Sequence, residues 1–341
     1  MLPDLGSPSR SLWQLLYGGV LKLRRRRLTR RADRLPRTVV SVGNLVWGGA
    51  GKTPLVAALA AHLRDGGRRV CVLSRGYGRR DAEVRVVSQG DGPLLGPAVA
   101  GDEPVLLAGS LPGVSVVVGP DRAAAGRQAL ERVTPEPDLF LLDDGFSHLR
   151  LARDLDLLAF PAADPWGGDR LPPSGRLREP LAAARYADTA LLTDSPGPAA
   201  VARLADGLGE RGFRGPVFGS GTEVRAARSV DGRELPHSVA VFLVSGIARP
   251  ERFEEMARRQ GFQVRGALRF RDHHEYTPEV LREIADTFKA SGADVLLTTS
   301  KDRVKLFGHL DVPLAELPIR ARPEEAFWSW LDERLREIES R

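Results

Sequence analysis

The stretch that decides the fold is residues 38–63, TVVSVGNLVWGGAGKTPLVAALAAHL. It opens with an apolar, β-branched run at residues 38–42 and closes with a run rich in alanine and leucine at residues 55–63. β-Branched residues favour strands, whereas alanine and leucine favour helices. The sequence therefore predicts a strand, a glycine-rich loop and a helix in immediate succession.

The glycine-rich loop predicts a phosphate-binding site. Backbone N–H groups at such a helix start point at an anion, and the helix dipole favours negative charge there. Lys52 would reach the β- and γ-phosphates of a nucleotide, and the Thr53 hydroxyl would contact Mg²⁺. The predicted nucleotide-binding residues are Gly48, Gly49, Ala50, Gly51, Lys52, Thr53 and Pro54. Val46 occupies the first glycine position of the strict pattern, which makes this a variant loop; the alternative is a glycine-rich turn with a chance lysine.

A second motif follows an apolar run at residues 139–142, which ends in Asp143-Asp144-Gly145. Carboxylates at the end of a buried strand are typical of the Walker B arrangement, in which they help to hold Mg²⁺ beside a phosphate loop. The alternative is an ordinary strand-ending turn, for which the same residues are common. Because a phosphate loop lies upstream, we interpret Asp143 and Asp144 as metal-site residues.

The rest of the chain alternates strand-like and helix-like runs up to residues 189–193, which are expected to close a doubly wound sheet. A second βαβαβ pattern lies between residues 239 and 299. The predicted fold class is α/β, with a P-loop NTPase-like, doubly wound, mostly parallel sheet and a second, smaller α/β domain. The predicted organisation is a P-loop domain at 1–222, a smaller domain at 223–320, and a helix at 321–341 packing back on the first domain.

Composition narrows the class of protein. The 341 residues contain one cysteine, which excludes a disulfide framework and a cysteine-type zinc site. The apolar runs are all shorter than the roughly 18 residues of a transmembrane helix, and the start of the sequence lacks the pattern of a secretory signal. We therefore expect a cytoplasmic protein that is soluble or peripheral to a membrane.

The N-terminal segment predicts a surface helix. Apolar side chains follow one helical face from Ser9 to Arg31, and a block of arginines flanks them. The whole chain has a net charge of +6. An apolar helix with a basic flank is typical of contact with an anionic membrane surface. Two alternatives stay open: arginine blocks also bind nucleic-acid phosphates, and such a helix can simply pack on the protein's own core.

Several polar residues follow predicted strands, where open α/β sheets bind their ligands. Asp102, in the segment Gly-Asp-Glu-Pro, is a candidate base, although an acidic residue there is also a common helix-start residue. His273, in Asp-His-His-Glu, is a candidate for proton handling beside a carboxylate; a polar helix cap is the alternative. Arg75 and Arg122 are candidate phosphate-binding arginines, with a surface turn and a solvated arginine as the alternatives. The long loop that carries Arg170, Arg176 and Arg178 is a candidate functional segment.

Together these motifs resemble the tetraacyldisaccharide 4′-kinase family, which phosphorylates a lipid A precursor in Gram-negative bacteria. The resemblance covers nearly the whole chain. The matching segments are residues 41–44, 48–54, 74–77, 101–104, 143–146, 177–180, 245–247, 272–274 and 301–302. The Val46 form of the loop is that of the family. The chain departs from the family at Ser147 and Arg249, where glutamine and asparagine are usual.

The resemblance implies transfer of the ATP γ-phosphate to the 4′-hydroxyl of a tetraacylated glucosamine disaccharide 1-phosphate. It implies ATP and Mg²⁺ as cofactors, with Asp102, supported by His273, as the base and Lys52, Thr53, Asp143 and Asp144 around the phosphates and metal. Arg75, Arg122 and Arg178 would meet substrate or nucleotide phosphates.

The implied partners are the lipid A precursor disaccharide and the inner-membrane surface, with the protein peripheral on the cytoplasmic face. Neither nucleic acid nor an obligate protein partner is implied. Two other functions remain: a P-loop kinase of a soluble metabolite, and a membrane-associated P-loop ATPase switch.

Overall fold

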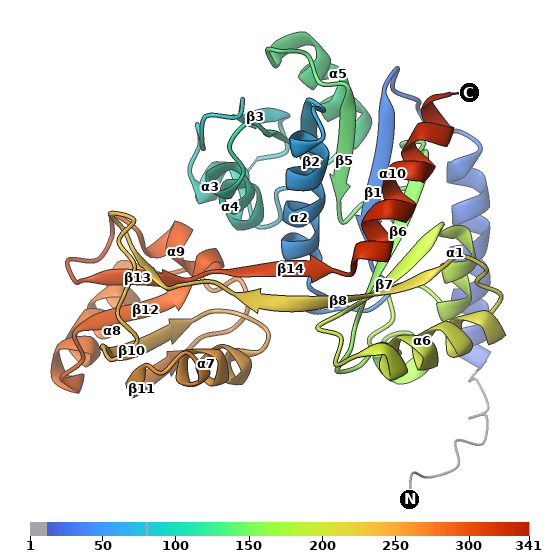
Figure 1. The fold of residues 1–341 in the computed structure, drawn as a ribbon. Helices are drawn as coiled ribbons and strands as arrows, with labels where there is room; N and C mark the ends of the chain where they lie inside the picture. The colour runs from blue at the N-terminus through green and yellow to red at the C-terminus, as the bar shows by residue number, and fades with distance from the viewer. Residues whose placement is uncertain (1–11, 80, 341) are drawn as a thin grey trace, which may run out of the picture.

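The computed structural model describes residues 12–79 and 81–340, with side chains from residue 17 onward. Two sheets organise them (Figure 1). A nine-stranded sheet with helices α1 to α6 and α10 forms the larger unit, and a five-stranded sheet with α7 to α9, spanning residues 228–317, forms the smaller unit.

The large sheet has the strand order β14-β8-β7-β6-β1-β5-β2-β4-β3. Its strands are parallel except at the two edges, where β3 and β14 run antiparallel to their neighbours. The predicted α/β fold with a mostly parallel sheet is confirmed. The strands are β1 (Thr38–Gly43), β2 (Val70–Ser74), β3 (Arg85–Ser88), β4 (Ser115–Val118), β5 (Leu139–Asp143), β6 (Leu155–Pro161), β7 (Thr189–Thr193), β8 (Val217–Val224) and β14 (Ile319–Pro323).

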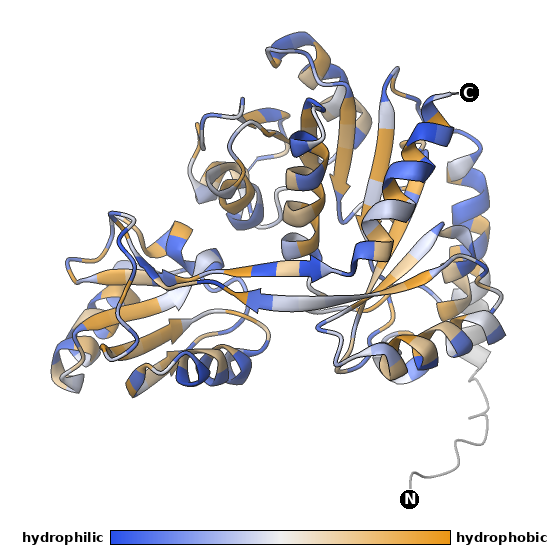
Figure 2. Cartoon of the chain, viewed as in Figure 1, coloured by the Kyte–Doolittle hydropathy of each residue, from blue (hydrophilic) through white to orange (hydrophobic). Residues whose placement is uncertain are grey.

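Helices cover both faces of this sheet, because its central strands are apolar on both sides. Apolar residues of α2, α4 and α10 pack on one face, and those of α1, α5 and α6 pack on the other. Figure 2 shows the apolar colour concentrated on the strands between these layers. The helices are α1 (Leu12–Thr29), α2 (Lys52–Asp65), α3 (Pro97–Ala100), α4 (Asp102–Ser110), α5 (Arg122–Arg132), α6 (Pro198–Glu210) and α10 (Glu325–Glu339), with short 3₁₀ helices η1 (Gly167–Asp169) and η2 (Leu181–Tyr186).

The smaller unit is the predicted second α/β pattern. Its sheet has the order β11-β10-β12-β13-β9, with α7 on one face and α8 and α9 on the other. The elements are β9 (Arg228–Ser229), β10 (Ala240–Ser245), α7 (Pro250–Arg259), β11 (Gln263–Arg269), α8 (Pro278–Ser291), β12 (Val295–Thr299), α9 (Ser300–Leu306) and β13 (Leu314–Leu317).

One prediction about the large sheet is wrong. β7 does not close it, because β8 pairs with β7 in parallel and β14 pairs with β8 in antiparallel. The chain leaves the larger unit along β8 and returns along β14, so these two strands form a ribbon that joins the two units (Figure 1). The predicted boundaries at 222/223 and 320/321 fall on or beside this ribbon and stay a prediction.

The two terminal helices both lie on the larger unit. α10 follows β14 and buries Phe327, Leu331 and Leu335 in the same core as α2. The His62 ring on α2 stacks on Trp328 of α10, with ring centroids 4.4 Å apart. The predicted N-terminal helix from Ser9 corresponds to α1; its first three residues lie outside the described residues.

Candidate active site

The glycine-rich loop connects β1 to α2 at the carboxyl edge of the large sheet. Lys52 is the first residue of α2, with Thr53 and Pro54 in the same turn. The Lys52 ammonium donates to Asn44 Oδ1 at 3.0 Å and lies 3.4 Å from Asp144 Oδ1. The predicted lysine of the phosphate loop is therefore held between the loop itself and the strand that carries the two carboxylates.

The rest of the loop turns through positive φ at Gly48 (109°) and Gly51 (67°). A side chain at Gly51 would crowd Thr193, whose Cβ would lie 3.2 Å from an added Cβ. Thr193 in turn donates its hydroxyl to Ala50 O at 3.0 Å, which fastens the loop to the end of β7. The loop's path thus depends on glycine at position 51.

Asp143 is the last residue of β5, and Asp144 follows it in the left-handed region with φ of 55°. Asp143 is buried and accepts a hydrogen bond from Ser74 Oγ at 3.2 Å. Burial raises the pKa of Asp143, and the charges of Glu103 and Asp144 raise it further. Partial burial works against ionisation of Asp144, but the charges of Lys52 and Arg178 outweigh it and hold the pKa of Asp144 below its usual range.

This pair of carboxylates suits a divalent cation. Burial and the neighbouring carboxylates raise the pKa of Asp143, and a bound cation would stabilise its ionised form. In the described part of the chain, no group of three or more His, Cys, Asp and Glu side chains is arranged to hold a metal ion by itself. Asp143 and Asp144 match the donors expected for Mg²⁺ on a nucleotide, where one or two carboxylates act together with phosphate oxygens.

The three predicted arginines lie in different surroundings. Arg178 donates to both oxygens of Asp144, at 2.9 and 2.7 Å, and its guanidinium stacks on Trp47 at 4.6 Å. Arg75 is exposed at the carboxyl end of β2. Arg122 is buried at the start of α5, where it donates to Gly119 O at 3.2 Å.

Arg122 is a buried cation that could bind an anionic ligand. Burial lowers its pKa to about 10 even though Asp143 and Asp144 oppose that change. Its buried Nε has no hydrogen-bond partner within the described residues. The adjacent His148 is neutral, because burial and the charge of Arg122 lower its pKa to about 4. An incoming phosphate would supply the missing acceptor for Arg122.

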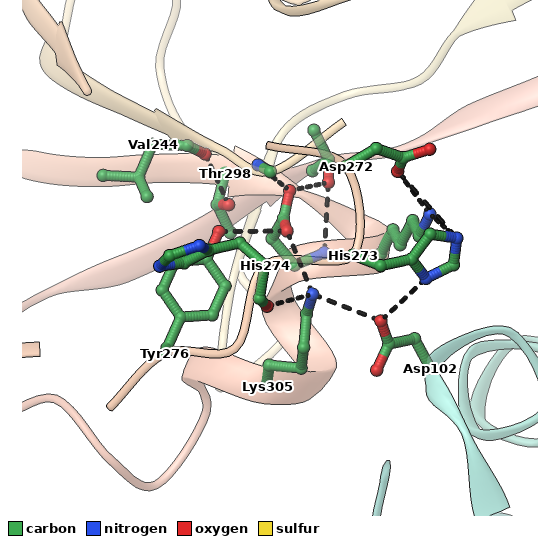
Figure 3. A network of polar contacts seen from close by, with 12 residues as sticks. Asp102, Val244, Asp272, His273, His274, Tyr276, Thr298 and Lys305 are labelled. Atoms are coloured by element: carbon green, nitrogen blue, oxygen red, sulfur yellow. Dashed lines mark hydrogen bonds and ion pairs between the residues drawn. The ribbon is translucent and has the colours of Figure 1, made fainter. Parts of the chain in front are cut away.

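Asp102 lies where the two units meet (Figure 3). It is the first residue of α4 in the larger unit, and both of its contacts come from the smaller unit. His273 Nδ1 lies 3.5 Å and Lys305 Nζ 3.2 Å from Asp102 Oδ2. Partial burial works against ionisation of Asp102, but the His273 hydrogen bond and the Lys305 charge outweigh it and lower its pKa. The predicted pair of Asp102 and His273 is therefore brought together.

Lys301 determines which ring nitrogen of His273 accepts a hydrogen bond. Its ammonium lies 3.1 Å from His273 Nε2 and donates to Asp272 Oδ1 at 2.8 Å. Because an ammonium can only donate, Nε2 must accept. In the neutral ring the proton is then on Nδ1, which faces Asp102. His273 thus presents an N–H to the carboxylate.

Asp302 anchors this cluster to the smaller sheet. It is fully buried and accepts hydrogen bonds from Gly246 N at 2.9 Å, Thr299 Oγ1 at 2.7 Å and Tyr276 Oη at 3.0 Å. Lys305 lies one helical turn beyond Lys301 on α9, so both ammonium groups project from the same face. The motifs at residues 245–247 and 301–302 therefore hold the segment of His273 and the helix of Lys301 and Lys305 in place.

Two glycines place Asp102 beside the loop that follows β2. A Cβ added to Gly76 would lie 2.6 Å from Ala100 O, and one added to Gly101 would lie 2.9 Å from Tyr77 O. Both glycines also have positive φ, of 67° and 91°. The backbones can approach this closely only without side chains. The close approach fixes the start of α4 against the loop that leaves the carboxyl end of β2.

Comparison with known proteins identifies the family. Residues 11–336 match the family described as Tetraacyldisaccharide-1-P 4′-kinase. The chain is 41% identical over 317 residues to the tetraacyldisaccharide 4′-kinase of Geobacter sulfurreducens, covering 90% of this chain and 87% of the relative. It is 41% identical over 332 residues to that of Pelobacter propionicus, covering 93% and 89%. The chain belongs to the tetraacyldisaccharide 4′-kinase family.

A solved structure agrees with this membership. LpxK from Aquifex aeolicus, crystallised in complex with ATP, superimposes with a TM-score of 0.75 at 33% identity and covers 96% of this chain and 97% of its own. The chain is thus a kinase with a P-loop α/β fold, and the family resemblance seen in the sequence is confirmed.

Several residues that the structure of this kinase adds to the site had no predicted role, although most of them lie in the motifs quoted from the sequence. The largest omissions are Lys301 and Lys305, which hold His273 and Asp102. A signal for them exists, since two lysines four residues apart directly after a buried strand would share one face of a helix. The others are Asn44, Ser74 and Glu103, which contact or influence the phosphate-loop lysine and Asp143. Ser147, where the family usually has glutamine, donates to Glu179 Oε1 at 2.7 Å.

Proposed function

We propose that this kinase transfers the γ-phosphoryl group of ATP to the 4′-hydroxyl of a tetraacylated glucosamine disaccharide 1-phosphate, which yields a 4′-phosphorylated lipid A precursor. One observation carries the site assignment. The Asp102–His273 pair lies at the same edge of the large sheet as Lys52 and the Asp143–Asp144 pair, which supports the proposal of a single site with a base and a phosphate-binding loop.

The loop and the carboxylates form the donor side of the proposed site. The β- and γ-phosphates would lie on the N–H groups at the start of α2, with Lys52 on their oxygens. Thr53, Asp143 and Asp144 would hold Mg²⁺, which supplies charge neutralisation for the phosphates when it is bound. Arg178 contacts Asp144 at 2.7 Å, and Arg75 and Arg122 supply further positive charge for substrate or nucleotide phosphates.

Asp102 is the proposed general base. Phosphoryl transfer passes through a loose transition state, so the hydroxyl proton is lost late and a carboxylate suffices to accept it. Both contacts of Asp102 use Oδ2, and Figure 3 shows its other carboxylate oxygen directed away from His273 and Lys305. His273 and Lys305 orient the carboxylate, and the His273 hydrogen bond and the Lys305 charge lower its pKa, which keeps it ionised until a proton arrives.

Contacts between the two units support a site that excludes water. Besides Asp102, Asp194 at the end of β7 accepts a hydrogen bond at 2.5 Å from Arg252 of α7 in the smaller unit. Excluding water from the phosphates would suppress hydrolysis of ATP in the absence of an acceptor.

The proposed base leads to a pH prediction for the variant Lys305→Met. Asp102 must be ionised to accept a proton, so the rate falls as the pH drops through its pKa. Lys305 lowers that pKa, and removing its charge should move the acid limb of the kcat/KM profile to higher pH. The rate should recover toward that of the unchanged kinase at alkaline pH. A profile identical to that of Lys289→Met, an exposed lysine on α8, would contradict this role.

We infer that α1 rests on the cytoplasmic face of the inner membrane. Val20 and Leu23 are 61% and 69% exposed on this helix, amid exposed basic residues. Apolar side chains flanked by arginines are the pattern of a helix lying in the interface of an anionic membrane. Among the described helices, none combines the length and apolar character needed to cross a bilayer.

The variant Val20→Glu/Leu23→Glu tests this contact. Burying two aliphatic side chains contributes about 3 kcal/mol or more, so the double change should weaken binding to anionic vesicles by at least ~100-fold. Vesicle sedimentation measures the bound fraction. The matched control is Phe307→Glu, which alters an apolar side chain that is 52% exposed at the end of α9 and should leave binding unchanged. Equal binding by both variants would leave α1 with a packing role only.

ATP turnover with and without the disaccharide separates the proposed function from its alternatives. We expect turnover that depends on the tetraacylated disaccharide 1-phosphate in detergent micelles. An ATPase switch would turn over ATP at the same rate without it. A kinase of a soluble metabolite would leave the disaccharide unmodified, and either result would refute the proposal.

A further inference from the structure

Arg25 differs from the other arginines of α1. The neighbouring Arg24, Arg26 and Arg27 are exposed, whereas Arg25 is only 6% exposed. Its guanidinium donates to both oxygens of Glu179, through Nε and Nη2 at 3.1 Å each. The side chains of this pair are 7% and 10% exposed. A buried, bidentate ion pair therefore joins the N-terminal helix to residue 179, which is 154 positions away.

The two segments that Arg25 contacts are those that carry the candidate metal site. Arg25 Nη2 also donates to Phe146 O at 3.2 Å, two residues after Asp144. Glu179 directly follows Arg178, the residue that binds both oxygens of Asp144. One guanidinium thus holds the backbone after Asp144 and the segment of the arginine that pairs with it.

Two further contacts make this connection specific. Ser147 donates to Glu179 Oε1 at 2.7 Å, so the segment after Asp144 and the segment after Arg178 are joined directly as well. The Arg25 guanidinium also lies over the rings of Phe146, at 4.3 Å, and Tyr186, at 5.2 Å. A planar, five-donor group fits this combination of carboxylate, carbonyl and aromatic face, and a lysine does not.

Stability alone does not account for the pair. Replacing a buried ion pair by apolar side chains of similar volume is often neutral or stabilising. The ion pair, together with the hydrogen bond to Phe146 O, fixes the relative position of the segments after Asp144 and Arg178. Asp144 needs such support, because a non-glycine residue with φ of 55° persists only when its surroundings hold it there.

We propose that Arg25 is a positioning residue for the metal site of this kinase. It acts through Glu179 and Phe146 on the placement of Asp144 and Arg178, and it does not itself contact metal or phosphate. The proposal rests on the proposed function, in which Asp143 and Asp144 hold a divalent cation. It also makes α1, the proposed membrane helix, a structural part of the catalytic site.

The experiment measures Mn²⁺ bound to the full-length kinase with a non-hydrolysable ATP analogue, by electron paramagnetic resonance. Loss of residues that orient metal ligands typically costs 10- to 100-fold in affinity. Arg25→Met should therefore weaken Mn²⁺ binding about 10-fold, and Arg25→Lys should recover only part of the loss. The double variant Arg25→Met/Glu179→Met removes the unpaired carboxylate, so it should fold even if the single variant does not, and it should still bind Mn²⁺ weakly.

The matched control is Arg153→Met. Arg153 pairs with Asp156 at 2.9 Å, with side chains 7% and 11% exposed, near the amino end of β6 and so at the other edge of the sheet. This variant should lower the melting temperature and leave Mn²⁺ affinity unchanged. If Arg25→Met and the double variant bind Mn²⁺ as tightly as Arg153→Met, Arg25 has no positioning role. If the unaltered kinase binds no Mn²⁺, the proposed metal site itself fails.

Discussion

Replacing Asp102 with asparagine should lower kcat by ~10²–10⁴-fold, the range that a general base contributes, while the affinity for ATP stays nearly unchanged. Asparagine has the same shape and still accepts a hydrogen bond from Lys305, so the contact between the two units is retained in part. Its amide oxygen cannot take up the hydroxyl proton. The loss should therefore appear in single-turnover rates of phosphoryl transfer and not in nucleotide binding.

The control for this prediction is Asp272→Asn. Asp272 binds Lys301 at 2.8 Å and lies 4.0 Å from His273 Nε2, the ring nitrogen that does not face Asp102, so its loss should have a much smaller effect. Equal losses of ATP affinity and kcat in Asp102→Asn would reassign Asp102 to nucleotide binding. A rate close to that of the unaltered kinase would mean that another group, or water, accepts the proton.

The second large effect is expected for Lys52→Met. Removing one preorganised donor to the transition-state charge typically costs ~10²–10³-fold in kcat. The variant would also lose the contact of the Lys52 ammonium with the phosphates of bound ATP before the reaction. Both kcat and the affinity for ATP should therefore fall, which distinguishes this variant from Asp102→Asn. Rapid-quench kinetics with nucleotide titration separates the two quantities.

Lys52→Met also removes a charge 3.4 Å from Asp144. Lys52 lowers the pKa of Asp144, so divalent-cation binding by the variant, which needs the ionised carboxylate, should begin to fall at a higher pH than in the unaltered kinase. Lys289→Met serves again as the control, because that lysine is exposed on α8. A normal rate in Lys52→Met would exclude the phosphate-loop role.

The elements of the fold were predictable wherever local sequence decides them. β1, the glycine loop and α2 follow from a β-branched run, three glycines and an alanine-rich run, which agree with one another. The elements of the smaller unit follow from the same kind of alternation. The ribbon of β8 and β14 was not predictable, because its strands are about a hundred residues apart in sequence and pair across the whole smaller unit.

The site was predictable in part for the same reason. Asp143, Asp144 and Lys52 belong to motifs whose spacing is local, and the structure places their side chains around one point. The contact of Lys305 with Asp102 joins the two units. The contact of Arg25 with Glu179 joins residues that are 154 positions apart in sequence. The helical spacing of Lys301 and Lys305 is visible in the sequence, but the partners of Lys305 and Arg25 are set by three-dimensional packing.

The most direct test of the account maps the new phosphate on the product. The purified kinase would be incubated with ATP, Mg²⁺ and tetraacylated glucosamine disaccharide 1-phosphate, and the product analysed by phosphorus–proton correlated NMR. The account predicts a second phosphomonoester coupled to the proton at carbon 4′, formed by the unaltered kinase and nearly absent with Asp102→Asn. ATP consumption with no new phosphomonoester, or a phosphate at any other position of the disaccharide, would contradict it.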